Sequence, residues 1–320
     1  MTGGRAIFGS GPGALPSDAF TLGIDPMTQR DRQDEALGII RRLLAGDDRF
    51  DYESDWFTLR DAKLQLLPLQ ENLPFAVASS ISPSGMTLAG KHRTGVLSIG
   101  SMSTAGLQAL PTQWGFAEDS ASQHGNQVDR ADWRIVMSWH LAETREKAEQ
   151  QAGPGLMHWH NEYTVATLQR PGALAYDTPA LAIQEMATGE QSAAVIGTPD
   201  DLIIAINKMI ALTGGFGTVI GFVHDWANPK DTANSWDLFA RYVVPEINGL
   251  LDGFRESEAY VKENRAVFER AGAAVVAKIM ENEKAAAAMQ EQANAPAAMR
   301  SPNAPDLSEV VKQQEKPKQA

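Results

Sequence analysis

The 320-residue sequence contains no cysteine, which excludes disulfides, thiolate nucleophiles, iron–sulfur clusters and cysteine-type zinc sites. Its 28 basic residues are outnumbered by 40 acidic ones, so a surface that neutralises nucleic-acid phosphates is not expected. No apolar run approaches the ~20 residues needed to span a bilayer, and no signal peptide is evident. Nucleophile-elbow, Walker and zinc-protease motifs are also missing. We therefore expect a soluble, cytoplasmic protein that binds neither nucleic acid nor membrane.

Short apolar runs alternate with helical patterns over most of the chain. Each run is unbroken, which is typical of a parallel sheet that helices cover on both faces. A doubly wound sheet and a (β/α) barrel both produce this pattern. A barrel needs eight strands, whereas the sequence predicts five, over residues 5–8, 74–78, 95–99, 133–139 and 218–223.

Helices are predicted between these strands. Asp25 and Pro26 resemble the cap and first-turn proline of a helix start. Apolar residues at helical spacing then continue over residues 32–45, where Gly46 is expected to end the helix. Further helices are expected around residues 86–89, 113–124, 144–163, 198–212 and 234–247.

The sequence suggests three parts. Residues 1–253 hold the α/β part, in which 50–67 predict short extended pieces and 164–196 a loop-rich insertion. Residues 254–292 predict one long C-terminal helix, whose apolar stripe would pack outside the sheet or join a partner subunit, as in a homo-oligomer. Residues 293–320, rich in Ala, Pro, Gln and Lys, predict a disordered tail.

A glycine loop follows the first predicted strand. Gly9, Ser10 and Gly11 would let a ligand approach the backbone closely, because two of the three residues carry no side chain. The spacing is not that of the dinucleotide-binding fingerprint, and no helix opens directly after it. A plain tight turn explains the loop equally well.

A cluster of serines offers a stronger signal. Ser79, Ser80, Ser82 and Ser84 lie between a buried strand and the start of a helix. Free backbone N–H groups and the helix dipole favour an anion at such a position. One serine would suffice as a helix cap, so the four hydroxyls favour a phosphate-binding loop over capping alone.

Arg30 and the histidines add weaker signals. Arg30 lies near the start of its helix, where the dipole disfavours a cation, so it either holds an anion or extends into solvent. His140 and His224 follow strands, where ligands bind in α/β sheets, although a structural role is the simpler explanation. His158 and His160 would point apart on a helix, so no metal site is expected. Core or pocket-lining positions are expected for Trp114, Trp139, Trp226 and Trp236.

Motifs along the chain carry a family resemblance. They are Thr2–Arg5 with Phe8–Gly11, Gly23–Asp25 with Arg30 and Glu35, Pro74–Ser80 with Leu88–Gly90, Ile196–Asp201, and Phe239–Ala240 with Val244–Glu246. In this order they resemble signatures of the bacterial luciferase-like flavin monooxygenases, and most of all the limonene monooxygenase branch.

The resemblance implies a (β/α)8 TIM barrel that binds reduced FMN at the carboxyl ends of its strands and uses O2 to oxygenate a small apolar substrate, such as a terpene of the limonene type. A separate flavin reductase would supply the reduced cofactor. The matching residues are Arg30, Ser80 and Ser84 for the phosphate, with Ser79 beside them, and Gly9, Ser10 and Gly11 for the loop that passes the flavin. Residues 100–132 would act as a lid.

The resemblance also implies an incomplete barrel. In the family, the first strands and usually the catalytic histidine precede the motif at which this chain has Met1. We therefore expect about five of the eight strands of a barrel, and the catalytic residue is unknown. Two other hypotheses stay open, a deazaflavin-dependent oxidoreductase on the same scaffold and a catalytically silent truncated subunit.

Overall fold

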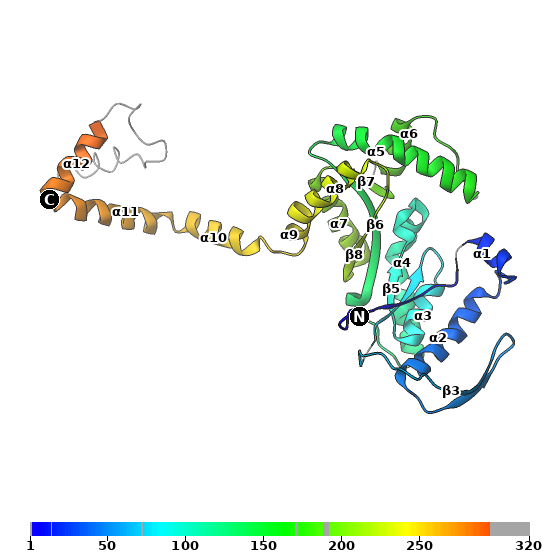
Figure 1. Ribbon diagram of the computed structural model, residues 1–320. Helices are drawn as coiled ribbons and strands as arrows, with labels where there is room; N and C mark the ends of the chain where they lie inside the picture. The colour runs from blue at the N-terminus through cyan, green and yellow to red at the C-terminus, as the bar shows by residue number, and fades with distance from the viewer. Residues whose placement is uncertain (1, 14, 72, 170–171, 188–191, 295–320) are drawn as a thin grey trace. The chain divides into compact units, whose positions relative to one another are not determined.

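The computed structural model describes residues 2–13, 15–71, 73–169, 172–187 and 192–294 (Figure 1). The chain divides into two compact units, Met1–Asn248 and Gly249–Ala320, close to the predicted boundary at residue 253. Within the described ranges, no helix combines the length and the apolar character that a membrane span requires.

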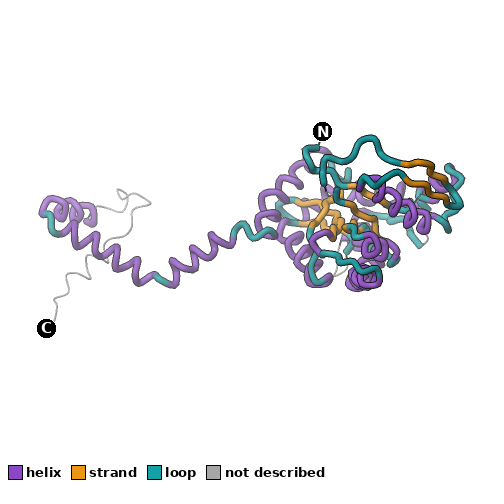
Figure 2. The backbone as a smooth tube through the Cα atoms, turned by 90° about the horizontal axis from the view of Figure 1, so that it is seen from below, coloured by secondary structure: helices purple, strands orange, loops and turns teal. Residues whose placement is uncertain are grey.

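A sheet of six parallel strands organises the first unit. The hydrogen-bonded order is β1–β4–β5–β6–β7, and β8 also pairs with β6. Figure 2 shows the helices of this unit around the strands. The strands are β1 (Phe8–Ser10), β4 (Phe75–Ser79), β5 (Gly95–Ser98), β6 (Trp133–Leu141), β7 (Ala194–Gly197) and β8 (Thr218–Phe222).

The predicted number of strands is wrong. The sequence pattern predicts five, and the structure adds β7 inside the presumed loop-rich insertion at 164–196, which also contains α6 (Pro179–Ala187). The four residues of β7 are all buried, and so short a run carries no periodic signal. Among the described residues no ladder joins β1 to β7 or β8, so the sheet is open rather than closed into a barrel.

Local signals explain several helix ends. Gly46 adopts a left-handed conformation (φ 80°) and ends α2, as predicted. At the start of α7, Thr198 and Asp201 form a reciprocal capping box. The helical segments of this unit, besides α6, are α1 (Pro16–Thr21), α2 (Gln29–Ala45), α3 (Ser84–His92), η1 (Gly100–Met102), α4 (Thr104–Gln123), η2 (Arg130–Asp132), α5 (Arg145–Trp159), the π-helix η3 (His160–Thr167), α7 (Pro199–Thr213), α8 (Pro229–Leu238), the π-helix η4 (Phe239–Val243) and α9 (Val244–Ile247).

The predicted helix start at Asp25 and Pro26 is wrong. Asp25 Oδ1 accepts a hydrogen bond from Met27 N (2.9 Å), and its carbonyl accepts one from Thr28 N (3.0 Å), which closes a turn before α2. The extended pieces predicted over residues 50–67 are confirmed as an antiparallel hairpin of β2 (Phe50–Glu53) and β3 (Thr58–Ala62).

The core lies on the face of β6 that carries its odd-numbered residues. Trp133 is fully buried there and stacks on Trp114 of α4, with ring centroids 5.2 Å apart. The indole Nε1 of Trp133 donates a hydrogen bond to Ser98 Oγ (2.8 Å). Because side chains alternate along a strand, Ser138 and His140 point to the opposite face of β6.

The second unit contains α10 (Asp252–Glu263), α11 (Arg265–Met280) and α12 (Glu283–Asn294). The prediction of one long helix over 254–292 is wrong, because two asparagines interrupt it. Asn264 Nδ2 donates to the carbonyl of Tyr260 (2.8 Å), and Asn282 Oδ1 accepts from Ala285 N (3.1 Å), which caps α12. Apart from residues 293 and 294, which end α12, the tail predicted for 293–320 lies outside the described residues.

Candidate functional site

The two polar loops that the sequence singled out lie at one edge of the sheet. β1 runs parallel to β4, with Ser10 opposite Val77. Parallel strands end on the same edge, so the loop after Ser10 and the loop after Ser79 are neighbours although they are far apart in sequence. A Cβ atom on Gly11 would lie 3.4 Å from Ala78 Cβ, because the glycine loop passes close to β4.

The serine loop contains a buried hydroxyl group without a partner. Ser79 is only 3% exposed, and no hydrogen bond reaches its Oγ from the described residues. An unpaired buried donor costs about 1–3 kcal/mol. A ligand that accepts a hydrogen bond from this hydroxyl would offset that cost. Ser80 is exposed, while the Oγ atoms of Ser82 and Ser84 lie 2.9 Å apart and share a hydrogen bond.

No side chain caps the start of α3. The cap position is Pro83, and it has no side-chain hydrogen bond to the helix. The serines therefore do not serve as the helix cap, and the N-terminal N–H groups of α3 remain suited to an anion. The helix also starts close against the strand, because a Cβ atom on Gly85 would lie 2.5 Å from the carbonyl oxygen of Ala78.

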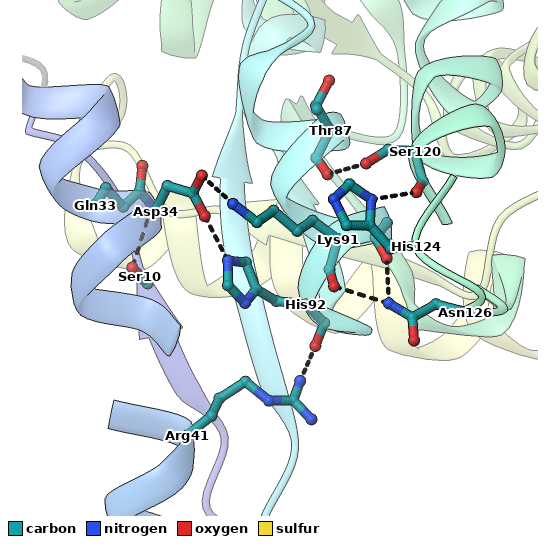
Figure 3. Close-up of polar contacts among 11 residues, drawn as sticks. Ser10, Gln33, Asp34, Arg41, Thr87, Lys91, His92, Ser120, His124 and Asn126 are labelled. Atoms are coloured by element: carbon teal, nitrogen blue, oxygen red, sulfur yellow. Dashed lines mark hydrogen bonds and ion pairs between the residues drawn. The ribbon is translucent and has the colours of Figure 1, made fainter. Parts of the chain in front are cut away.

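Arg30 is not brought into contact with the serines. It is the second residue of α2, its side chain is exposed, and no described residue pairs with it. Its phosphate-binding role therefore stays a prediction. The link between α2 and the glycine loop is instead a hydrogen bond from Gln33 Nε2 to Ser10 Oγ (3.1 Å; Figure 3). Glu35, from the same motif, accepts a hydrogen bond from the Tyr52 hydroxyl (2.9 Å) and so holds the hairpin on α2.

The expected lid over residues 100–132 is wrong, because most of this segment is α4, whose apolar face is buried in the core. Ser120 Oγ of α4 donates to the carbonyl of Thr87 in α3 (2.8 Å; Figure 3). Gln113 Nε2 donates to the carbonyl of Ile81 (3.0 Å). The helix therefore supports the serine loop from behind instead of closing over it.

His140 and His224 lie near the carboxyl ends of β6 and β8 and are both hydrogen-bonded. His140 Nε2 is 3.0 Å from Gln151 Oε1, and His224 Nε2 is 2.9 Å from Ser138 Oγ. Burial lowers the pKa of His224 to about 4, and the charge of Asp225 offsets this only in part. Burial also lowers the pKa of His140, against the opposing effect of its hydrogen bond to Gln151. Both rings are neutral at neutral pH.

Aromatic rings surround His224. Its imidazole stacks on Trp226 with centroids 3.9 Å apart, Trp159 meets it edge-on at 5.4 Å, and Phe222 lies at 4.6 Å. Phe222, Trp159 and Ser138 were not among the residues that the sequence pattern indicated. Alternation of Phe222, His224 and Trp226 after the strand could have indicated a common face. Trp159 comes from α5, so no local signal places it there.

Parallel strands joined by helices, with polar loops gathered at one carboxyl edge, define the class of α/β proteins that bind ligands at that edge. A family model described as luciferase-like monooxygenase matches residues 1–214. The chain belongs to the luciferase-like monooxygenase family, as the sequence motifs predicted.

Two curated relatives that cover more than three quarters of the chain are named monooxygenases. It is 41% identical over 276 residues to 4-hydroxyprotoasukamycin monooxygenase from Streptomyces nodosus subsp. asukaensis, a match covering 85% of this chain and 73% of the relative. It is 39% identical over 250 residues to limonene 1,2-monooxygenase from Rhodococcus erythropolis, which covers 78% of this chain and 62% of the relative. The chain thus spans less than two thirds of the limonene enzyme.

Solved structures share the fold. Monooxygenase RslO1 from Streptomyces bottropensis superposes with a TM-score of 0.61 at 21% identity, over 75% of this chain and 68% of that one. The oxygenating constituent of 3,6-diketocamphane monooxygenase from Pseudomonas putida, solved with FMN, has a TM-score of 0.60 at 23% identity, over 76% of this chain and 71% of that one. An F420-dependent secondary alcohol dehydrogenase has a TM-score of 0.54 at 17% identity, over 75% of this chain and 69% of that one. The TM-scores of these superpositions confirm the predicted α/β fold of the TIM-barrel type.

Proposed function

We propose that the chain is the oxygenating part of a flavin-dependent monooxygenase, binding reduced FMN and transferring one oxygen atom of O2 to a small apolar substrate. A separate flavin reductase supplies the reduced cofactor. Membership of the luciferase-like family and relatives that are named monooxygenases support the reaction type. The name of the limonene 1,2-monooxygenase supports an apolar, terpene-like substrate.

The observation that carries the choice of a flavin with a phosphate group is the unpaired hydroxyl of Ser79 beside the uncapped start of α3. A phosphate group accepts hydrogen bonds only, and this place offers donors that lack a partner within the described structure. The exposed Ser80 and the half-buried Ser84 add hydroxyls around the same helix start. These residues therefore fit the phosphate end of the cofactor.

When bound, the reduced flavin supplies two electrons, so that one oxygen atom of O2 leaves as water and the other enters the substrate. The residues of this chain bind and orient. Ser79, Ser80, Ser84 and the first N–H groups of α3 hold the phosphate, and Arg30 adds a positive charge. Gly9 and Ser10, at the end of β1, and Gly11 directly after it pass the flavin, because the two glycines leave room beside β4.

The first prediction tests the phosphate site by comparing FMN with riboflavin, which lacks the phosphate. Replacing Arg30 with Ala should weaken FMN binding roughly ten- to a hundredfold, since a charge-assisted hydrogen bond contributes about 1.5–3 kcal/mol. Ser79→Ala should weaken it several-fold. Riboflavin binding should hardly change in either variant, as measured by quenching of flavin fluorescence.

Arg60→Ala provides the matched control, because Arg60 is exposed on β3 of the hairpin and no described residue pairs with it. Equal losses of both flavins in Arg30→Ala would remove Arg30 from the phosphate site. A chain that binds a deazaflavin and no FMN, seen from the absorbance of the bound chromophore, would favour the deazaflavin-dependent hypothesis. A chain that binds neither would favour a silent subunit.

A further inference from the structure

The aromatic cluster around His224 has no part in the phosphate site, yet it lies at the same carboxyl edge of the sheet. Ser138 of β6 stands opposite Phe222 of β8 in the parallel register. His224 follows two residues later, and its Nε2 is held 2.9 Å from Ser138 Oγ. A bond between two strands thus fixes the imidazole ring at the end where α/β sheets bind their ligands.

Part of this cluster is open to solvent. Phe222 is 45% exposed and Tyr163 is 42% exposed, while Trp159 and His224 are half-buried between them and the core. Trp159 links the two sides, because its ring lies 6.1 Å from Tyr163 and 5.4 Å from His224. The result is an exposed aromatic face backed by buried rings.

The backbone next to the aromatic cluster contains a π-helical segment, a type of irregularity that is frequent at functional sites. Trp159 is the last residue of α5, and Tyr163 lies in η3, a π-helical segment of eight residues. π-helical turns are rare and occur frequently at functional sites. Here the change of helix type falls between Trp159 and Tyr163.

The size of the face points to a small ligand rather than a protein. The exposed parts of Phe222 and Tyr163 amount to roughly 200 Å², since an aromatic side chain offers about 150–250 Å² in all. A stable protein interface needs about 800 Å² from each partner. A single ring of six to ten carbon atoms, in contrast, would cover a face of this size.

We propose that Tyr163, Trp159, Phe222 and His224 form the wall that contacts the ring of an apolar cyclic substrate. Ser138 acts as a positioning residue, because it holds the imidazole and does not itself reach the ligand. The inference rests on the proposed function for the apolar class of the substrate.

The test uses the full chain without flavin and limonene as the probe. Free limonene is measured by headspace gas chromatography, and binding is followed in parallel by tryptophan fluorescence. Phe222→Ala and Tyr163→Ala should each weaken limonene binding at least fivefold. Both residues lie outside the buried core, at 45% and 42% exposure, so the variants should keep the far-ultraviolet circular dichroism spectrum and the urea midpoint of the parent chain.

Phe116→Ala is the matched control, because Phe116 is 39% exposed on α4 and has no part in the wall. It should change limonene binding by less than twofold. A second measurement follows the ring protons of His224 by NMR, which should shift when limonene is added to the parent chain and much less in Phe222→Ala. Ser138→Ala should reduce that shift as well.

Three results would overturn the proposal that these residues form a substrate-binding wall. They are a parent chain that binds no limonene, unchanged affinity in both Phe222→Ala and Tyr163→Ala, and a change of subunit mass in Phe222→Ala in place of the loss of limonene. The last result would assign the face to a protein contact. Failure of the chain to bind FMN would contradict the proposed function separately, because limonene binding is measured without flavin.

Discussion

At the scale of the residue, Gly85 decides whether α3 can start directly against β4. A Cβ atom there would lie 2.5 Å from the carbonyl oxygen of Ala78 and 2.8 Å from Ser79 Cβ. Gly85→Ala should therefore lower the free energy of unfolding by about 1–3 kcal/mol, as overpacking usually does. It should also weaken FMN binding, because the serine loop has to move. Urea denaturation and flavin titration measure the two effects.

Gly115→Ala is the control for this second prediction. Gly115 is an exposed residue inside α4, and its added Cβ would meet no atom within 4 Å. The higher helix propensity of alanine should raise the free energy of unfolding by about 0.5–1 kcal/mol. If the Gly85→Ala variant were as stable as the parent chain, the close approach of the first turn of α3 to β4 would be contradicted.

The third prediction concerns the charge of His224. Its pKa is lowered from 6.5 to about 4 in the folded chain, so between these pH values the unfolded chain binds a proton that the folded chain does not. Stability is therefore full above pH 6.5 and falls as the pH decreases toward 4. We expect a loss of about 1–2 kcal/mol, since solvent reaches part of the ring.

Urea denaturation at pH 7.5 and pH 5 measures this loss, with His224→Gln as the comparison because glutamine does not titrate. The difference between the two pH values should be smaller in the variant, with a remainder from His140, whose pKa is also lowered. A variant as sensitive to pH as the parent chain would show that another group dominates.

At the scale of the element, Asp34 joins α2 to α3. Its carboxylate lies 2.6 Å from Lys91 Nζ and 2.6 Å from His92 Nε2 (Figure 3). Burial raises the pKa of Asp34, but the hydrogen bonds from Lys91 and His92 outweigh burial and leave the pKa below its usual 3.8. This contribution to stability is present above pH 3.8 and is lost as the pH falls below it.

Asp34→Asn, the fourth prediction, should lower the free energy of unfolding by about 1 kcal/mol at neutral pH, because the ion pair with Lys91 and the contact with His92 are partly exposed. Asp47→Asn is the control, since its pair with Arg42 lies further out in solvent. It should cost less than about 0.5 kcal/mol. If urea denaturation gave the same loss of unfolding free energy for both substitutions, Asp34 would contribute no more to stability than an exposed ion pair does.

At the scale of the whole molecule, the two compact units should be separable. The helices α10 and α11 expose apolar side chains that include Phe254, Tyr260, Val267 and Phe268. The fifth prediction is that removal of residues 249–320 leaves the urea midpoint and the flavin affinity of the first unit unchanged but alters subunit mass or solubility. Such apolar faces usually mark contacts with a partner.

Light scattering and sedimentation measure the mass of the shortened and the full chain. Identical mass and solubility would show that these helices do not join a partner subunit. A lower urea midpoint would show that the second unit supports the first.

Much of the chain follows from local sequence. Unbroken apolar runs predicted β4, β5, β6 and β8 because strands covered on both faces need such runs. Gly46 ended its helix because a left-handed residue was required there. The serine loop was located because it stands between a buried strand and a helix. Family motifs, which preserve order along the chain, predicted the luciferase-like family.

The tertiary structure alone decided the rest, since it depends on residues that are distant in sequence. The strand β7 was hidden because four buried residues carry no periodicity. The breaks at Asn264 and Asn282 are the exception, because their hydrogen bonds are local and the continuous apolar stripe concealed them. Burial of Ser79 without a partner, and the meeting of Trp159 with His224, arise when separate elements pack. Local pattern therefore determined which elements form, whereas packing decided which side chains share a site, because only packing removes water and brings distant groups together.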